Sequence, residues 1–346
     1  MQALPPVLGR AWVCSPGAAQ SAAQQLRVAT YNVLAQCYTR SSWFPWSPSA
    51  SLKWKQRGAA LLRDIDALSA DVLLLQECED CEPFWVPALR QRGYEGLWKK
   101  RTEVTGAKKD GCAIFWRAAA LALDGDALFV EHNELCAGLP PRPEGSPPPR
   151  ADNGATLDAR TRLERDCVGV VAQLAILRDG PRGADAGALG ADVPRLVVAN
   201  THLYWDPAFA DVKLAQAEHM LRRIALFRAD CAARRGAAAE PPVVFGGDFN
   251  SLPASEVHAL LTRHDGAPPL RSAYAAAAGA EPSYTNLTPD FTGTLDYLLV
   301  SPDVAVVAAL ETPGPGLGVG LPDASHPSDH LPLAALLGFG DAAAPS

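Results

Sequence analysis

The chain has 346 residues, of which 48% are hydrophobic, so it is long and apolar enough to build one large buried core. Its formal net charge of −7 excludes a protein that holds nucleic acid through a global positive field. A nucleic-acid ligand would therefore need local basic patches or metal ions to offset the repulsion of its phosphates.

Strands and helices alternate along the chain, which predicts a layered α/β domain. The first predicted strand covers residues 26–33, and helical spacing of apolar residues follows at 54–70. A buried strand at 71–75 ends at Gln76 and Glu77, and a long helix is predicted from Pro207 to about Arg228. Further strands are predicted at 111–116, 168–177, 195–202, 242–248, 294–300 and 331–337.

Three stretches rich in Gly, Pro, Ala or charged residues interrupt this pattern, and we interpret them as surface loops or disordered insertions. They cover residues 137–155, 179–194 and 313–325. We predict one folded domain over residues 26–338, an unstructured segment at 1–25 and a short tail at 339–346.

The eight cysteines are scattered, and without a secretory signal we interpret them as reduced thiols. Cys78 and Cys81 form one Cys-x-x-Cys, but no second pair and no histidine at zinc spacing follows, so a zinc or thiol enzyme has little support. No apolar run approaches the roughly 18 residues that span a bilayer. We therefore expect a protein without a membrane partner.

Polar side chains that suit a divalent metal and a phosphate stand at the ends of predicted strands. They are Asn32, Glu77, His202, Asp248, Asn250, Asp296, Asp329 and His330. Each has an ordinary structural explanation by itself, such as a turn former, a cap or a hydrogen-bonded core histidine. The stretch 246–251 is harder to explain in that way, because its two glycines let the backbone pass close to another group.

Six short motifs follow one another along the chain: Thr-Tyr-Asn-Val-Leu at 30–34, Leu-Gln-Glu at 75–77, Asn-Thr-His at 200–202, Gly-Asp-Phe-Asn-Ser at 247–251, Asp-Tyr at 296–297 and Ser-Asp-His at 328–330. They are similar to the ordered motifs of the endonuclease/exonuclease/phosphatase superfamily, over nearly the whole chain. The resemblance implies a DNase I-like four-layer α/β sandwich with two facing mixed β-sheets and a site in the cleft at one end.

Longer stretches at 111–115, 201–207, 211–216 and 290–297 resemble the deadenylases of the carbon catabolite repressor type, in particular plant and algal members without leucine-rich repeats. The resemblance implies a poly(A)-specific 3′–5′ exoribonuclease that releases AMP. It also implies that Phe291 stacks on an adenine and that Pro207 helps line the base pocket. Cys167 departs from the pattern, because many relatives carry Asn there. This puts one phosphate or metal contact implied by the resemblance in doubt.

The resemblance further implies a metal site. Glu77, with Asn32 assisting through its amide oxygen or through water, would anchor one Mg²⁺, for which Mn²⁺ could substitute. Asp329 would hold a second metal.

The catalytic roles follow from the chemistry of phosphodiester hydrolysis. Asp248 would deprotonate the attacking water, and Asn250 would fix that water or touch the phosphate. His330 would donate to a nonbridging oxygen, with Asp296 orienting it, and His202 would be a further donor.

The expected partner is single-stranded RNA, poly(A) or an adenine nucleotide, and we expect no leucine-rich-repeat region for docking into a larger deadenylase complex. The expected location is the cytoplasm, with the nucleus or an organelle not excluded. Two sources of positive charge for the RNA backbone are basic residues near the predicted 111–116 strand and the long helix: Lys99, Lys100, Arg101, Lys108, Lys109 and Lys213. An ordinary solvated loop explains the first five equally well. Trp43, Trp46 and Trp54, near Lys53 and Lys55, are either an RNA surface or buried packing.

Two other functions stay open. One is a phosphatase or phosphodiesterase of the same superfamily acting on a small nucleotide, as in the nocturnin branch, which removes the 2′-phosphate of NADP(H), or the branch that cleaves 2′,5′-oligoadenylate. The other is a non-catalytic RNA-binding protein, which the unbroken set of acidic and histidine residues disfavours.

Overall fold

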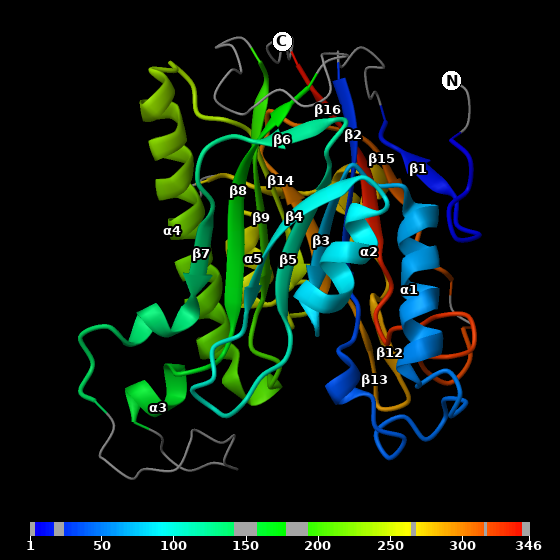
Figure 1. Cartoon of the computed structure of the whole chain (residues 1–346). Coiled ribbons are helices and arrows are strands. Elements are labelled where there is room, and N and C mark those ends of the chain that lie inside the picture. Colours follow the sequence, from blue (N-terminus) through cyan, green and yellow to red (C-terminus); the bar gives the residue numbers. More distant parts are fainter. Residues whose placement is uncertain are drawn as a thin grey trace.

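Two mixed β-sheets lie at the centre of the computed structural model, which describes residues 4–16, 24–141, 158–177, 193–263, 268–314 and 317–340 (Figure 1). The first sheet has seven strands, in the order β1 (Trp12–Cys14), β15 (Ala305–Leu310), β16 (Leu333–Phe339), β2 (Gln24–Asn32), β3 (Val72–Gln76), β5 (Gly111–Arg117) and β4 (Tyr94–Lys100). Its β2 and β3 are parallel, and the other neighbours are antiparallel.

The second sheet also has seven strands. They are β11 (Arg271–Ser272), β14 (Asp296–Val300), β10 (Val243–Asp248), β9 (Arg195–His202), β8 (Val168–Ile176) and β6 (Leu121–Leu123), with β7 (Leu128–Glu131) also paired to β8. Only β9 and β10 are parallel. A separate hairpin consists of β12 (Asn286–Thr288) and β13 (Phe291–Gly293).

Helices cover the outer faces of both sheets. The first sheet carries α1 (Trp54–Leu68) and α2 (Val86–Arg90), and the second carries α4 (Ala210–Arg235) and α5 (Glu256–Leu261). Shorter helices are α3 (Ala159–Leu163), α6 (Ala273–Ala278), a π-helix at Cys81–Trp85 and 3-10 helices at Gln36–Tyr38, His132–Cys136 and Pro207–Phe209. None of the described helices has both the length and the apolar character that crossing a membrane requires.

Three apolar cores separate these four layers. Alternate residues of β3 divide between two of them: Val72 and Leu74 face the core between the sheets, whereas Leu73 and Leu75 face the core beneath α1 and α2. Because both faces of the strand are covered, its sequence is a continuous apolar run instead of an alternating one. The third core lies between the second sheet and α4 and α5. This arrangement confirms the predicted four-layer sandwich.

Side-chain hydrogen bonds join the two sheets near the ends of their parallel strands. Gln76 donates from Nε2 to Oδ1 of Asn200 (2.8 Å), and Asn200 donates from Nδ2 to the carbonyl oxygens of Leu75 (2.8 Å) and Ala113 (2.9 Å). A side chain at position 246 would meet Leu74 Cδ1 at 2.7 Å, so it would have to displace the Leu74 side chain. These hydrogen bonds fix the end of β3 in the first sheet relative to the end of β9 in the second.

The prediction that residues 1–25 are unstructured is wrong for the part that the structure describes. Trp12–Cys14 forms β1 at the edge of the first sheet, paired with β15. Arg10 is buried and donates from Nη1 to Pro332 O (2.9 Å) and from Nε to Glu311 O. No apolar periodicity marks a strand of three residues, because its stability comes from a partner about 300 positions away.

Two other boundaries need correction. Residues 317–325 contain no helix or strand, as predicted for a loop, but Leu321 is completely buried with Tyr284 and Leu331, so the centre of this loop is not on the surface. The last strand includes Phe339, one residue beyond the predicted domain end. Most of the predicted loops at 137–155 and 179–194 lie outside the described residues, as do residues 341–346 of the tail.

Candidate active site

The polar residues that end the predicted strands are brought to one end of the sandwich. Asn32 ends β2, and Gln76 pairs with it on the parallel strand β3, which places Glu77 beside Asn32. In the second sheet, Asp248 is opposite His202 on one side and opposite Asp296 on the other. Parallel neighbours end at the same edge of a sheet, which is why residues so distant in the chain converge.

Asp248 lies at the centre of the group. Its Oδ2 accepts from Asn32 Nδ2 (2.9 Å) and lies 3.4 Å from His202 Nε2 and 3.7 Å from His330 Nε2. Its Oδ1 accepts from the backbone N–H of Asn250 (3.0 Å). Burial and then the Asp296 carboxylate raise the pKa of Asp248, whereas His330 and the amide of Asn32 oppose the rise, and the resulting pKa is about 6. A carboxylate tuned in this way suits proton transfer near neutral pH.

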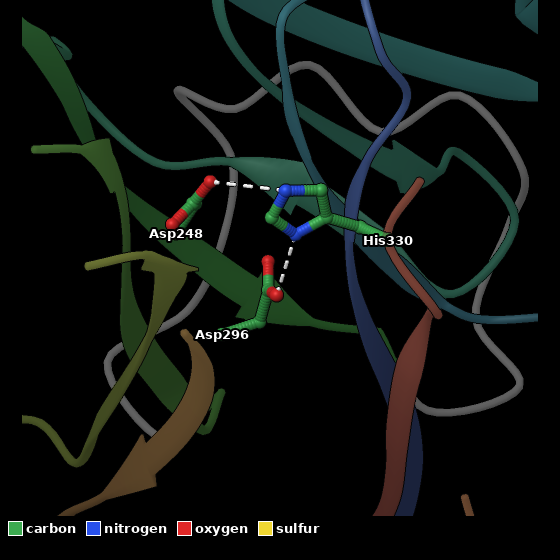
Figure 2. Close-up of side chains that lie close together, drawn as sticks. All are labelled: Asp248, Asp296 and His330. Carbon is green, nitrogen blue, oxygen red and sulfur yellow. Dashed lines mark hydrogen bonds and ion pairs between the residues drawn. The ribbon is translucent and has the colours of Figure 1, made fainter. Parts of the chain in front are cut away.

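His330 lies between two carboxylates (Figure 2). Its Nδ1–H donates to Asp296 Oδ2 at 2.7 Å, and its Nε2 faces Asp248. Burial by itself would lower the pKa of this imidazole, but the charges of Asp296 and Asp248 outweigh burial and raise the pKa well above its usual value. His330 is therefore an imidazolium at neutral pH, with an N–H at Nε2.

His202 has the opposite protonation state. Arg101 donates from Nη2 to His202 Nδ1 at 2.7 Å, so that nitrogen is the acceptor and the ring proton is on Nε2. Burial, the positive charge of Arg101 and that of His330 lower the pKa of His202 well below its usual value. The two histidines thus direct one charged and one neutral N–H donor toward the same oxygen of Asp248.

Arg101 belongs to a chain of contacts that sequence analysis missed. Its Nε donates to Asp110 Oδ2 (2.7 Å), and Asp110 Oδ1 accepts from the hydroxyl of Tyr38 (3.0 Å). We predicted Arg101 as a free cation for RNA, but its side chain is 10% exposed and is committed to Asp110 and His202. Its proximity to a basic stretch was the only signal in the sequence, and that signal suggested the wrong role.

Glu77 faces Asn32 and lies in a negatively charged environment. Its Oε1 accepts from Asn32 Nδ2 (3.1 Å), and its Oε2 accepts from the backbone N–H of Ala35 (2.8 Å). Burial, together with the carboxylates of Asp110 and Asp329, raises the pKa of Glu77 to about 7. A divalent cation would relieve this repulsion between carboxylates.

The amide of Asn32 does not have the orientation that we predicted for a metal ligand. Its Oδ1 accepts from the backbone N–H of Leu34 (3.0 Å), and its Nδ2 is the atom that faces Glu77 and Asp248. Reversing the amide would oppose two N–H groups at Leu34, so the hydrogen bonds fix this orientation. Asn32 therefore links the two carboxylates as a donor.

The oxygen ligands present here fit a hard divalent ion. Asp329 has a buried Oδ1 without a hydrogen-bond partner, and its negative charge is close enough to raise the pKa of Glu77. Oxygen ligands without thiolates are what Mg²⁺ and Mn²⁺ prefer. A second group, Asp248, Asp296 and His330, has ligand atoms within 4.8 Å of one another. Because His330 Nδ1 is already hydrogen-bonded to Asp296 within that group, we assign the group to proton chemistry.

Backbone strain is concentrated at the site. Glu77 has φ of 59° and Asn250 has φ of 48°, in the left-handed region that side chains seldom adopt. Asn250 also donates from Nδ2 to Leu203 O (3.0 Å), and its carbonyl accepts from Lys213 Nζ (2.7 Å). These bonds hold the strained turn after β10 in place.

The two predicted base-binding residues are exposed at the starts of short elements. Phe291 begins β13 of the small hairpin and is 36% exposed. Pro207 is exposed at the start of the 3-10 helix that leads into α4. Leu252, 46% exposed and two residues after Asn250, lies against the same hairpin, because a side chain at Gly293 would meet both Leu252 and Phe291.

Arg57, from α1, is a second residue that sequence analysis missed. It is buried and donates from Nη2 to the carbonyl oxygens of Val33 (2.8 Å) and Leu34, and from Nε to Pro327 O (2.8 Å). One guanidinium thus holds the segment after Asn32 against the segment before Asp329. The helical spacing of 54–70 gave no sign of this, because an arginine on a surface helix is usually exposed.

The other predicted cations for RNA also have protein partners. Lys99 pairs with Glu131, Lys100 with Glu103, Lys108 with Asp166 and Lys109 with Glu79, and Lys213 binds Asn250 O. Of the three predicted tryptophans, Trp54 begins α1 and packs against the core beneath that helix, and Trp46 packs on Phe44, whereas Trp43 is 51% exposed. All eight cysteines are free thiols, and among the described residues none joins a group of metal-ligand atoms.

Comparison with known proteins gives the following matches. The model of the Endonuclease/Exonuclease/phosphatase family matches residues 29–330. The Carbon catabolite repressor protein 4 homolog 4 of Arabidopsis thaliana is 35% identical, over 90% of this chain and 77% of that protein. The CCR4-Not complex 3′-5′-exoribonuclease subunit Ccr4 of Yarrowia lipolytica is 28% identical, over 90% of this chain but only 48% of that protein.

Solved structures show the same fold. The human Nocturnin catalytic domain with bound sulfate anion has a TM-score of 0.64 and 23% identity, over 97% of this chain and 99% of that one. ANGEL2, a 2′,3′-cyclic phosphatase, in complex with adenosine-2′,3′-vanadate has a TM-score of 0.69 and 24% identity, over 95% and 98%.

Proposed function

The chain belongs to the endonuclease/exonuclease/phosphatase family, and from that membership we propose that it is a magnesium-dependent 3′–5′ exoribonuclease that removes AMP from poly(A). Membership, together with relatives named as exoribonucleases, supports a nuclease or phosphodiesterase. Relatives named as 3′-5′-exoribonuclease subunits support RNA as the substrate. The observation that carries the proposal is the convergence of Asp248 with two imidazoles and, through the amide of Asn32, with Glu77.

Glu77 and Asp329 would hold the metal. Their mutual repulsion and the unpartnered Oδ1 of Asp329 support this assignment. When bound, a divalent ion neutralises phosphate charge and helps to form the nucleophile.

Asp248 would accept the proton of the attacking water. Its pKa of about 6 keeps it deprotonated at neutral pH and still basic enough to take a proton. Asn32 and the backbone N–H of Asn250 each donate to one of its oxygens and so fix the plane of the carboxylate.

The two histidines would bind the nonbridging phosphate oxygens. Their Nε2 atoms lie 3.4 and 3.7 Å from Asp248, longer than strong hydrogen bonds, so both N–H groups can turn to a substrate oxygen. His330 supplies a full positive charge and His202 a neutral donor. Asp296 binds Nδ1 of His330, and Arg101 binds Nδ1 of His202, so each ring is held through the nitrogen that does not face Asp248. Donors fixed in this way stabilise charge that develops during the reaction.

The terminal adenine would stack on Phe291, with Pro207 on the border of the base pocket. An aromatic side chain at the edge of a site suits a single-stranded base, because every base has a face that can stack. The exposure of Phe291 on a hairpin close to Leu252 and Asn250 supports this role.

A substrate panel tests the proposal. Pure protein with Mg²⁺ is incubated separately with poly(A), other homopolymers, 2′,5′-oligoadenylate, adenosine 2′,3′-cyclic phosphate and NADPH, each with and without EDTA. We expect AMP from poly(A), faster than mononucleotides from the other polymers, and no reaction with EDTA. Preferred hydrolysis of a small nucleotide would replace the exoribonuclease proposal with a phosphatase or phosphodiesterase of the same family.

A further inference from the structure

Four basic side chains near α1 have no carboxylate partner. Within the described part of the chain, Arg40, Lys53, Lys55 and Arg63 form no ion pair, in contrast to the paired lysines around β4. All four are exposed. In a protein with a net charge of −7, unpaired cations gathered on one region form a local site of positive potential.

An exposed aromatic residue stands beside this charge. The indole of Trp43 is 51% exposed, and the guanidinium of Arg40 lies 4.8 Å from its ring centroid. The neighbouring Phe44 is buried and contacts Trp46 edge to face, so the loop has a small core of its own that holds Trp43 outward. A rigid loop that presents an aromatic ring and an arginine suits the face of a nucleic-acid base.

The loop of residues 35–53 is attached to the active site on two sides. At its start, the backbone N–H of Ala35 donates to Glu77 Oε2, and that of Cys37 donates to Glu79 Oε2 (2.6 Å). Further on, Trp46 Nε1 donates to Leu321 O (3.2 Å), next to Gly320, which packs near Pro289 of the hairpin that carries Phe291. The loop therefore lies beside the site, on the side of Glu77 and the hairpin (Figure 1).

A groove continues from this loop along α1. It has a volume of about 610 Å³ and runs between the helix and residues 323–327. Lys55 and Arg63 line it, eight residues apart and thus on one face of the helix. Its only acidic residue, Asp323, pairs with His326 at 3.0 Å. The groove thus offers a polyanion two free positive charges in a row.

We propose that the RNA upstream of the cleaved nucleotide leaves the site over residues 35–53, stacks a base on Trp43 and runs with its phosphates past Lys55 and Arg63. The inference rests on the proposed exoribonuclease function and extends it to a substrate much longer than a dinucleotide. A small nucleotide bound at Asp248 and Phe291 would not reach this surface.

Equilibrium binding tests this proposed RNA track, which runs from Trp43 past Lys55 and Arg63. The probe is a 5′-fluorescein-labelled oligo(A) of 20 nucleotides, in EDTA to prevent hydrolysis, and the unlabelled trinucleotide ApApA is the competitor. We expect Trp43→Ala to weaken binding of the 20-mer about tenfold and Trp43→Phe to keep it. The double variant Lys55→Ala/Arg63→Ala should weaken it by a similar factor and reduce the slope of log K against log salt by about one. None of these variants should change the affinity for ApApA.

Arg222→Ala is the matched control, because Arg222 is exposed on α4, which covers the other sheet. Unchanged 20-mer affinity in both Trp43→Ala and the double variant, or equal losses for the 20-mer and ApApA, would overturn the track. Binding of the 20-mer through Trp43 without AMP release in Mg²⁺ would leave the track standing and refute the exoribonuclease. AMP release that none of the variants slows would leave the exoribonuclease proposal standing and refute the track.

Discussion

Charged neighbours set the protonation of each catalytic group at the scale of single residues. Asp296 and Asp248 keep His330 protonated, whereas Arg101 keeps His202 neutral, although both imidazoles are buried. The same side chain therefore supplies two different donors within one site. Titration of these groups is the most direct readout of that difference.

Replacing Asp296 by Asn tests the state of His330. The variant removes the carboxylate that contributes most to the raised pKa of His330, so we expect that pKa to fall. Activity that needs protonated His330 would then be lost at lower pH, and the alkaline limb of the kcat/KM profile would move toward acid. The profile measured from pH 5 to 10 checks this. An alkaline limb at the wild-type position would refute the role of His330 as a charged donor.

Metal affinity should depend on pH through Glu77. Burial and the neighbouring carboxylates raise the pKa of Glu77 to about 7, so below pH 7 a proton competes with the metal for this group. We expect Mn²⁺ or Mg²⁺ affinity measured by calorimetry to rise by about tenfold per unit as pH increases toward 7 and to level off above it. Glu77→Gln should bind weakly without this dependence. Equal wild-type affinities at pH 6 and pH 8 would contradict the assignment.

At the scale of elements, hydrogen bonds between segments distant in sequence determine the geometry of the site. The strand ends could be predicted, because apolar runs that stop at Asn32, Glu77, His202 or Asp248 are visible in the sequence. The contacts that orient those residues could not. Arg57 lies 270 residues from Pro327, and no local pattern reports a bond across that distance. For the same reason, β1 was missed.

Arg57→Met tests the link between α1 and the two site segments. The change leaves the carbonyl oxygens of Val33, Leu34 and Pro327 without donors, and each buried acceptor costs about 1–3 kcal/mol. We expect the free energy of unfolding in urea to fall by at least about 2 kcal/mol and kcat to fall with it. Arg222→Met, on the exposed face of α4, is the control and should change neither.

Arg10→Leu tests whether the segment before β2 is part of the fold. Arg10 is buried and its guanidinium binds the backbone of Glu311 and Pro332, so we expect a loss of at least about 2 kcal/mol of unfolding free energy. Thermal unfolding at constant protein concentration would show it. A variant as stable as wild type would mean that this segment contributes nothing to the folded state.

At the scale of the whole molecule, the layers could be predicted from the sequence, whereas the distribution of free charge could not. The alternation of strands and helices predicted a layered α/β domain, and the family resemblance implied its two facing sheets. Runs such as residues 72–76 are continuously apolar because they are buried on both faces. Charge could not be assigned in the same way: the lysines nearest to the predicted site are paired, whereas Lys55 and Arg63, which form no ion pair, lie along α1. Whether a cation is free depends on the three-dimensional positions of the acidic residues, which spacing does not encode.

The central claim is that residues from both sheets act together on a phosphodiester bond, with Asp248 as the base. The most direct measurement is the initial rate of AMP release from a 20-nucleotide oligo(A) in Mg²⁺, for wild type and for Asp248→Asn, which keeps the shape of the side chain. We predict that the variant folds with wild-type stability or better, because it removes a buried charge, and that kcat falls by at least about a hundredfold. AMP release by Asp248→Asn at a rate close to that of wild type would contradict the account.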